Sequence, residues 1–414
     1  MIVLSGAALV LPDRILAPGT LTIENGRIAE IRPDAPASDA HVLFAFHGYY
    51  IVPGFVDVHV HGVDGVDTLD SATAVDSIAE RLPRYGVTAF CPTTVACRPE
   101  ALRRVLEQVK NAREAPSATA ARVLPAHLES NFINPAYNGA QPLECLRLPG
   151  AAGARAGRGR AEPDGSGTAD GFTAGDILAE IERAAPDVGI VTLAPELDGG
   201  LDLVRALAAQ GHRVSLGHSG ASYEEALAAI AAGARQATHL FNRMPPLDHR
   251  SPGLVGAVLQ AEEVAAEIIC DGVHVHPAVM RAAIAAKRPS RVLAITDGTA
   301  VSGLPPGSRG RLGGRPIIAG PSTATLEDGT MAGSILTMDR AFRVLVGHVG
   351  LSLVDAVTLT STTPARELGL VGHGVLAPEA VADLVVLDAN FGVVQTYLGG
   401  QLVYSRNTAG LDSV

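Results

Sequence analysis

The sequence is poor in cysteine, in basic residues relative to acidic ones, and in long apolar runs. Four cysteines among 414 residues, none in a close-paired motif, argue against a disulfide framework and favour the cytoplasm, where thiols stay reduced. The 32 Lys and Arg against 43 Asp and Glu give a net charge of -11, which argues against a nucleic-acid partner. No uncharged run approaches the roughly 18 residues that a membrane span requires, and the apolar start lacks the basic segment of a secretory signal.

The sequence contains instead eight short apolar runs with helical patterns between most of them. The predicted strands are Phe55–His59, Val87–Thr93, Val123–Leu128, Gly189–Ala194, Arg213–Leu216, Gln236–His239, Ala265–Cys270 and Val292–Thr296. The predicted helices include Ala72–Arg84, Pro99–Ala112, Gly175–Ala184, Gly200–Gln210, Ser222–Ala232 and Pro277–Ala286, and a later pair at Met338–Val346 and Ser352–Thr358. Alternation of this kind implies a parallel sheet, and eight units close it into an α/β fold, the (β/α)8 TIM-like barrel.

Both ends of the chain lack the alternation of strands and helices and instead contain short β runs separated by turns. Glu24-Asn25-Gly26-Arg27 is typical of a hairpin turn between two of them. We therefore expect a small β-sandwich domain from residues 1–52 and 376–414, with the catalytic barrel at 53–375 between them. Residues 150–170 are rich in Gly, Ala and Arg without periodicity and are predicted to be a flexible loop.

Almost every apolar run ends in a residue that can bind a metal or move a proton. His59 and His61 share one face of a strand, because side chains alternate with period two. Glu129, His218 and His239 end three further strands, and together they form a three-ligand set with an open position for water. Asp297 ends the last strand, where a carboxylate can take a proton from water and return it to a leaving nitrogen.

Each of these residues also has a structural reading when taken alone. The histidines could be satisfied core or rim residues, Glu129 could form a rim salt bridge, and Asp297 could cap a helix or an Asx-turn. Their coincidence at equivalent strand ends favours a divalent metal site. Histidine and carboxylate ligands suit Zn, Fe, Mn or Co alike, so the pattern does not select the metal.

At this level of detail the chain resembles the amidohydrolase superfamily, and within it the N-acetylglucosamine-6-phosphate deacetylase family. The resemblance covers roughly residues 50–390. The motifs that carry it are VPGFVDVHVHG (52–62), AHLE (126–129), TLAPE (192–196), GHS (217–219), THLFNRMP (238–245), DGVH (271–274), ITD (295–297) and GTMAGS (329–334).

The resemblance implies an enzyme that hydrolyses the N-acetyl amide of N-acetylglucosamine 6-phosphate. Metal ligands would be Glu129, His218 and His239, with Asp297 as general base and acid. His274 would polarise the acetyl carbonyl or hold a substrate hydroxyl, and Asn242 and the backbone at Arg243 would face the sugar phosphate. Arg250 would reach the phosphate from a neighbouring subunit, which implies a homodimer.

Three departures from the family pattern affect these expectations. Glu129 is followed by Ser130-Asn131-Phe132 where Gly-Pro-Phe is usual, and Gln141 replaces a histidine expected at the sugar. The pair His59 and His61, absent from some relatives, makes a second metal site an open reading. The alternatives that remain are an enzyme for another substrate and a non-catalytic scaffold. The other substrates are another N-acetylated sugar (the galactosamine epimer or an unphosphorylated form), an N-acyl amino acid, a cyclic amide or a base that is deaminated. The fourth strand ends in Pro195-Glu196 without a nearby lysine, which argues against the cyclic-amide enzymes.

Overall fold

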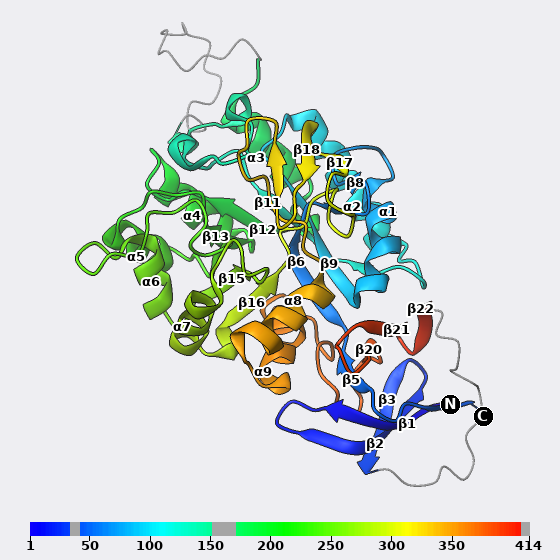
Figure 1. The fold of residues 1–414 in the computed structure, drawn as a ribbon. Helices are drawn as coiled ribbons and strands as arrows, with labels where there is room; N and C mark the ends of the chain where they lie inside the picture. The colour runs from blue at the N-terminus through cyan, green and yellow to red at the C-terminus, as the bar shows by residue number, and fades with distance from the viewer. Residues whose placement is uncertain (34–41, 151–170, 407–414) are drawn as a thin grey trace, which may run out of the picture.

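The computed structural model describes residues 1–33, 42–150 and 171–406. The central part of the chain forms a parallel sheet that closes almost completely into a barrel, and strands from the two ends form a separate mixed sheet (Figure 1). The predicted fold class is therefore confirmed. The loop predicted at 150–170 lies, from residue 151 on, outside the described residues.

The barrel contains eight strand positions, one of which is split in two. Its strands are β6 (Phe55–Val60), β9 (Val87–Thr94), β10 (Arg122–Val123), β11 (Ala126–Glu129), β12 (Val188–Leu193), β13 (Arg213–Leu216), β14 (Gln236–Ala237), β15 (Ala265–Ile269) and β16 (Val292–Ile295). The split falls at Leu124-Pro125, where proline lacks the amide hydrogen that the ladder needs. The ends meet where the amide of Asp297 donates to the backbone oxygen of His59 at 2.9 Å.

Helices flank this barrel, and each of them buries apolar residues. They are α1 (Ala74–Arg81), α2 (Pro99–Glu114), α3 (Ala174–Arg183), α4 (Gly200–Ala209), α5 (Tyr223–Ala231), α6 (Gly253–Gln260), α7 (Pro277–Lys287), α8 (Met338–Val344), α9 (Leu353–Val357) and α10 (Thr363–Glu367). Helices α3 and α5 begin with capping boxes at Thr173 and Ser222, which satisfy amides of the first turn. In the described ranges no helix combines the length and apolarity needed to cross a bilayer.

The terminal sheet joins the beginning and the end of the described chain. Its strands are β1 (Ile2–Val10), β2 (Ile15–Glu24), β3 (Arg27–Pro33), β4 (Val42–Ala45), β5 (Tyr50–Pro53), β20 (Leu384–Leu387), β21 (Val393–Leu398) and β22 (Gln401–Ser405). The two halves meet where β5 runs antiparallel to β20, with Val52 opposite Val385. The predicted turn joins β2 to β3, and Asn25 and Gly26 both have positive φ, as a tight hairpin requires.

Several parts of the fold were not predicted. Helix α6 is almost uniformly apolar, so it lacks the periodicity that marks a surface helix. A three-stranded antiparallel sheet, β17 (Arg309–Leu312), β18 (Arg315–Ala319) and β19 (Ala324–Leu326), follows the last barrel strand and has its own small core. A short hairpin, β7 (Gly62–Val63) and β8 (Val66–Asp67), follows β6. The boundaries at residues 52/53 and 375/376 stay a prediction.

Candidate metal centre

Three side chains from different strand ends meet around one carboxylate oxygen. Oε1 of Glu129, at the end of β11, lies 2.8 Å from Nε2 of His218 and 2.8 Å from Nε2 of His239. The two histidines follow β13 and β14, and all three side chains are buried. The sequence-predicted ligands Glu129, His218 and His239 are thus brought together at one mouth of the barrel.

The hydrogen bonds around His218 show that this group fits a cation. The Nδ1–H of His218 donates to the backbone oxygen of Tyr137 at 2.7 Å, so Nε2 of the neutral ring carries a lone pair. That lone pair faces a carboxylate oxygen, and two acceptors at this distance repel each other unless a proton or a cation lies between them. One carboxylate and two imidazoles form a ligand set that accepts a divalent transition metal and leaves positions for water or substrate.

A second group adjoins the first. Nε2 of His59 lies 3.2 Å from Nε2 of His61, and Nε2 of His61 lies 3.5 Å from Oε2 of Glu129. Burial lowers the pKa of His61, but the carboxylates of Asp297 and Glu129 outweigh it and raise that pKa to about 10. The group is therefore strongly attractive to positive charge, and His59, His61 and Glu129 could hold a second cation.

Asp297 faces both histidines of this second group. Its Oδ1 lies 3.2 Å from Nε2 of His61 and 3.4 Å from Nε2 of His59. Burial raises the pKa of Asp297, but the neighbouring His59 and His61 lower it further, so the pKa lies below its usual value. The side chain is an ionised carboxylate at neutral pH and can accept a proton.

His274 borders the same space from the loop after β15. Its Nδ1–H donates to Oδ2 of Asp271 at 2.5 Å, which fixes the ring. Burial lowers the pKa of His274, but Asp271 raises it more, so the net shift is upward and favours the charged ring. His274 can then donate from Nε2 to a carbonyl or hydroxyl oxygen.

Three of the candidate site residues have a strained backbone. His218, His239 and Asp297 have φ angles of 49°, 31° and 48°, in the left-handed region that residues with a Cβ rarely adopt. Such strain clusters at functional sites, where the surrounding structure over-determines it. It also explains why β14 and β16 end before His239 and Asp297, two residues and one residue short of the predicted strand ends.

A cavity of about 470 Å³ opens over these side chains. Its walls include His61, Glu129, Gln141, His218, His239, Asn242, Arg243, His274 and Asp297. The guanidinium of Arg243 passes over Gly139, where an added Cβ would lie 2.6 Å from Nε. A larger cavity of about 580 Å³ lies beside α1 and α2 and the terminal sheet, and none of the predicted site residues lines it.

Two predicted substrate-binding residues have contacts that the sequence did not indicate. The side-chain oxygen of Gln141 accepts from the amide of Ala96 at 2.7 Å, and its Nε2 donates to Oε2 of Glu129. Arg250 is exposed and does not line the cavity within its own chain; its amide donates to Oδ1 of Asp248 at 2.8 Å. Asn242 stays at the cavity and donates to the backbone oxygen of His239 at 3.1 Å.

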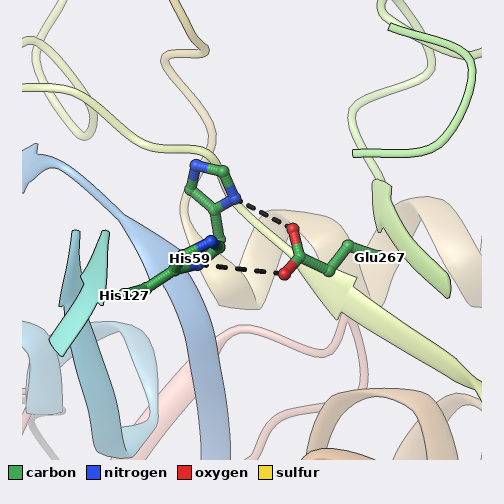
Figure 2. Close-up of side chains that lie close together, drawn as sticks. All are labelled: His59, His127 and Glu267. Atoms are coloured by element: carbon green, nitrogen blue, oxygen red, sulfur yellow. Dashed lines mark hydrogen bonds and ion pairs between the residues drawn. The ribbon is translucent and has the colours of Figure 1, made fainter. Parts of the chain in front are cut away.

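Several polar side chains beneath the site were not predicted. His127 donates from Nδ1 to the backbone oxygen of Val58 at 3.0 Å and accepts at Nε2 from Thr192, at 2.8 Å. Burial lowers the pKa of His127 to about 4, so the ring is neutral. Glu267 on β15 faces His59 and His127 (Figure 2). The sequence did contain a signal for Glu267, which is the one charged residue in the apolar run Ala265-Ala266-Glu267-Ile268. A buried charge needs partners, so this residue could have been recognised as part of a polar cluster.

The comparisons with other proteins agree with this geometry. The model described as "Amidohydrolase family" matches residues 50–403. The N-acetylglucosamine-6-phosphate deacetylase of Rattus norvegicus is 37% identical over 409 residues, which cover 96% of this chain and 91% of the relative. The chain belongs to the amidohydrolase family.

Two further relatives of this amidohydrolase bear on its substrate. The structure of a mutant N-acetyl-D-glucosamine-6-phosphate deacetylase from Mycobacterium smegmatis, in complex with N-acetyl-D-glucosamine-6-phosphate, matches with a TM-score of 0.84 at 31% identity. That match covers 98% of this chain and 99% of the other. The N-acetylgalactosamine-6-phosphate deacetylase of Escherichia coli O157:H7 is 34% identical over 388 residues, or 92% of this chain and 94% of the relative. The resemblance inferred from the motifs is confirmed.

Proposed function

We propose that this amidohydrolase removes the acetyl group from N-acetylglucosamine 6-phosphate and releases acetate and glucosamine 6-phosphate. The observation that carries the proposal is the convergence of Glu129, His218 and His239 beside the ionised Asp297, in a cavity of about 470 Å³. Relatives named for this reaction match almost the whole chain.

Glu129, His218 and His239 would hold one divalent cation of the Zn, Fe, Mn or Co type, and His59 and His61 with Glu129 a second. Bound there, such a cation polarises an amide carbonyl and lowers the pKa of water. Asp297 takes the proton of the attacking water at Oδ1 and gives it to the amide nitrogen as the C–N bond breaks. His274 donates from Nε2 to the carbonyl oxygen or to a sugar hydroxyl.

The phosphate would be held by arginine. Arg243 lines the cavity, whereas Arg250 is exposed on the same loop and lies outside it. We propose that Arg250 enters the cavity of a second copy in a homodimer, because guanidinium binds phosphate through two parallel hydrogen bonds. The low cysteine content supports a cytoplasmic location.

A second candidate substrate is N-acetylgalactosamine 6-phosphate. It is favoured by Gln141, which replaces a histidine expected at the sugar, and by the relative named for the galactosamine reaction. The two sugars differ only in the configuration of one hydroxyl.

Acetate release from a panel of N-acetylhexosamines, with and without the 6-phosphate, tests the proposal. We expect N-acetylglucosamine 6-phosphate to give the highest kcat/KM, and Arg250→Ala to raise KM with little change in kcat. A higher kcat/KM for the galactosamine form would select the second candidate. Equal rates with unphosphorylated sugars would contradict the phosphate assignment, and the absence of acetate from every sugar would contradict the proposed function.

A further inference from the structure

Glu267 is a fully buried carboxylate below the metal centre, with three N–H donors around it. Its Oε2 accepts from Nδ1–H of His59 at 2.9 Å and from the amide of His239 at 3.2 Å. Its Oε1 accepts from Nε2–H of Gln236 at 2.5 Å. A buried charge is tolerated only with such compensation, so its place in the barrel is tightly specified.

The trio of His59, His127 and Glu267, shown in Figure 2, is not itself suited to a cation. Both ring nitrogens of His127 are engaged, one by the backbone oxygen of Val58 and one by Thr192. Both oxygens of Glu267 already accept hydrogen bonds from N–H groups. The trio is therefore a support beneath the ligands.

The hydrogen bond from His59 sets the direction of its other nitrogen. Because Nδ1–H points down at Glu267, Nε2 carries the lone pair and points up toward Nε2 of His61, 3.2 Å away. A carboxylate behind an imidazole fixes its tautomer and raises its basicity as a ligand. Glu267 therefore prepares His59 for the second ligand group.

The same carboxylate also holds a member of the first ligand group. Nδ1 of His239 is buried and has no hydrogen-bond partner in the described part of the chain, so the side of the ring away from Glu129 is not held by a hydrogen bond. Its backbone is anchored instead, through the amide that donates to Glu267. This bond supports the left-handed conformation of His239, at φ 31°.

We propose that Glu267 is a positioning residue that couples the two ligand groups, orienting His59 in one and His239 in the other. The inference rests on the proposed function, since it requires cations at these groups. The effect on the two groups is unequal. Glu267 accepts from the ring of His59, which is itself the candidate ligand, but only from the backbone amide of His239. Loss of the charge at Glu267 therefore weakens the His59 and His61 group most.

Glu267→Gln tests this role because it keeps the shape and removes the charge. The amide cannot accept from His59, His239 and Gln236 together, and Gln236 cannot turn over to compensate, because its oxygen accepts from Arg213 at 2.6 Å. The matched control is Glu180→Gln, a buried glutamate on α3 that pairs with Arg103 and Arg183 away from the cavity.

The experiment measures zinc bound per full-length chain by mass spectrometry, over a series of buffered free-zinc concentrations. Wild type is expected to bind two zinc ions, and Glu267→Gln to lose about 10- to 100-fold in affinity for the weaker one, while Glu180→Gln matches wild type. A merely structural role would lower the melting temperature of the zinc-free chain and leave the zinc affinity of the folded protein unchanged. Unchanged affinity, a loss confined to the tighter zinc, or a single zinc in wild type would each overturn the proposal.

A gentler variant keeps the test decisive should Glu267→Gln fail to fold. Gln236→Leu removes only one donor to Glu267, and we expect the weaker zinc to lose severalfold in affinity; no change would contradict the proposal. Zinc binding and acetate release are separate readouts. If wild type binds two zinc ions and releases no acetate, the proposed function fails while the role of Glu267 stands or falls on the zinc series alone.

Discussion

The Nε2 atoms of His218 and His239 lie 3.1 Å apart, although each histidine follows a different barrel strand. Both nitrogens lie 2.8 Å from the same oxygen of Glu129. Three atoms that can each donate a lone pair are thereby held around one point. Both histidines have φ angles in the left-handed region, which costs conformational free energy. Strain of this kind is typical of functional sites.

Replacing Glu129 should remove the cation without unfolding the protein. In Glu129→Gln the neutral amide is a poor ligand, and we expect less than one zinc per chain and a loss of acetate release of about 100-fold or more. Zinc content and initial rates measure both effects. The control is Glu196→Gln, since Glu196 holds loop groups, including the amide of Gly220 at 2.6 Å, and does not line the cavity. A Glu129→Gln protein with full zinc content would show that the carboxylate is not a ligand.

Asp297→Asn should separate proton transfer from metal binding. The amide cannot accept the proton of the attacking water, so we expect kcat to fall by about 10²- to 10⁴-fold. The zinc held by Glu129, His218 and His239 should remain. Steady-state kinetics and zinc analysis of one preparation give both numbers, and full turnover by the variant would remove Asp297 from the reaction.

Gln141→Leu distinguishes a supporting role from a sugar-binding role. Because Gln141 accepts from the buried amide of Ala96 and contacts Glu129, its loss leaves that amide unsatisfied. We expect the free energy of unfolding to fall by about 1–3 kcal/mol, together with a fall in kcat. Urea denaturation and kinetics measure these effects. If only KM rises and stability is unchanged, Gln141 acts on the sugar as the sequence comparison suggested.

Lys287 makes the stability of the protein depend on pH in the alkaline range. Burial and the nearby charge of Arg291 lower the pKa of Lys287 from 10.5 to about 8, while its Nζ donates to the backbone oxygen of Val258 at 3.0 Å. Between these two pKa values the unfolded chain binds more protons than the folded protein does. The contribution of Lys287 to the free energy of unfolding therefore rises with pH, and it is lost as pH falls through about 8.

The matched comparison is Lys287→Met, which removes the titration. The unfolding free energy of wild type minus that of the variant should increase by about 3 kcal/mol between pH 7.5 and pH 10.5. Urea denaturation of both proteins at several pH values measures it. A difference that is flat, or that falls with pH, contradicts a lowered pKa at Lys287.

The strands and the convergence of the candidate ligands could be predicted because their signals are local. Apolar runs between turns mark the strands, and Glu129, His218 and His239 each lie within two residues of the end of such a run. The parallel barrel then requires their strand ends to share one mouth. The predicted strand Arg213–Leu216 matches the structure residue for residue.

The contacts that support the ligands could not be predicted, because they depend on distant partners. Glu267 lies 208 residues from His59, and no short-range pattern relates the two. Gln141 was assigned to the sugar by resemblance, whereas its contacts with Ala96 and Glu129 emerge only when the loops fold over the barrel. Helix α6 escaped prediction because it has no polar face to reveal its period.

The most direct test of the account is acetate release from N-acetylglucosamine 6-phosphate by one preparation before chelation, after chelation, and after zinc is restored. Since Glu129, His218 and His239 fit a cation and Asp297 only moves the proton, activity should disappear with the metal and return with it. Undiminished acetate release from a protein shown to be free of metal would contradict the central claim.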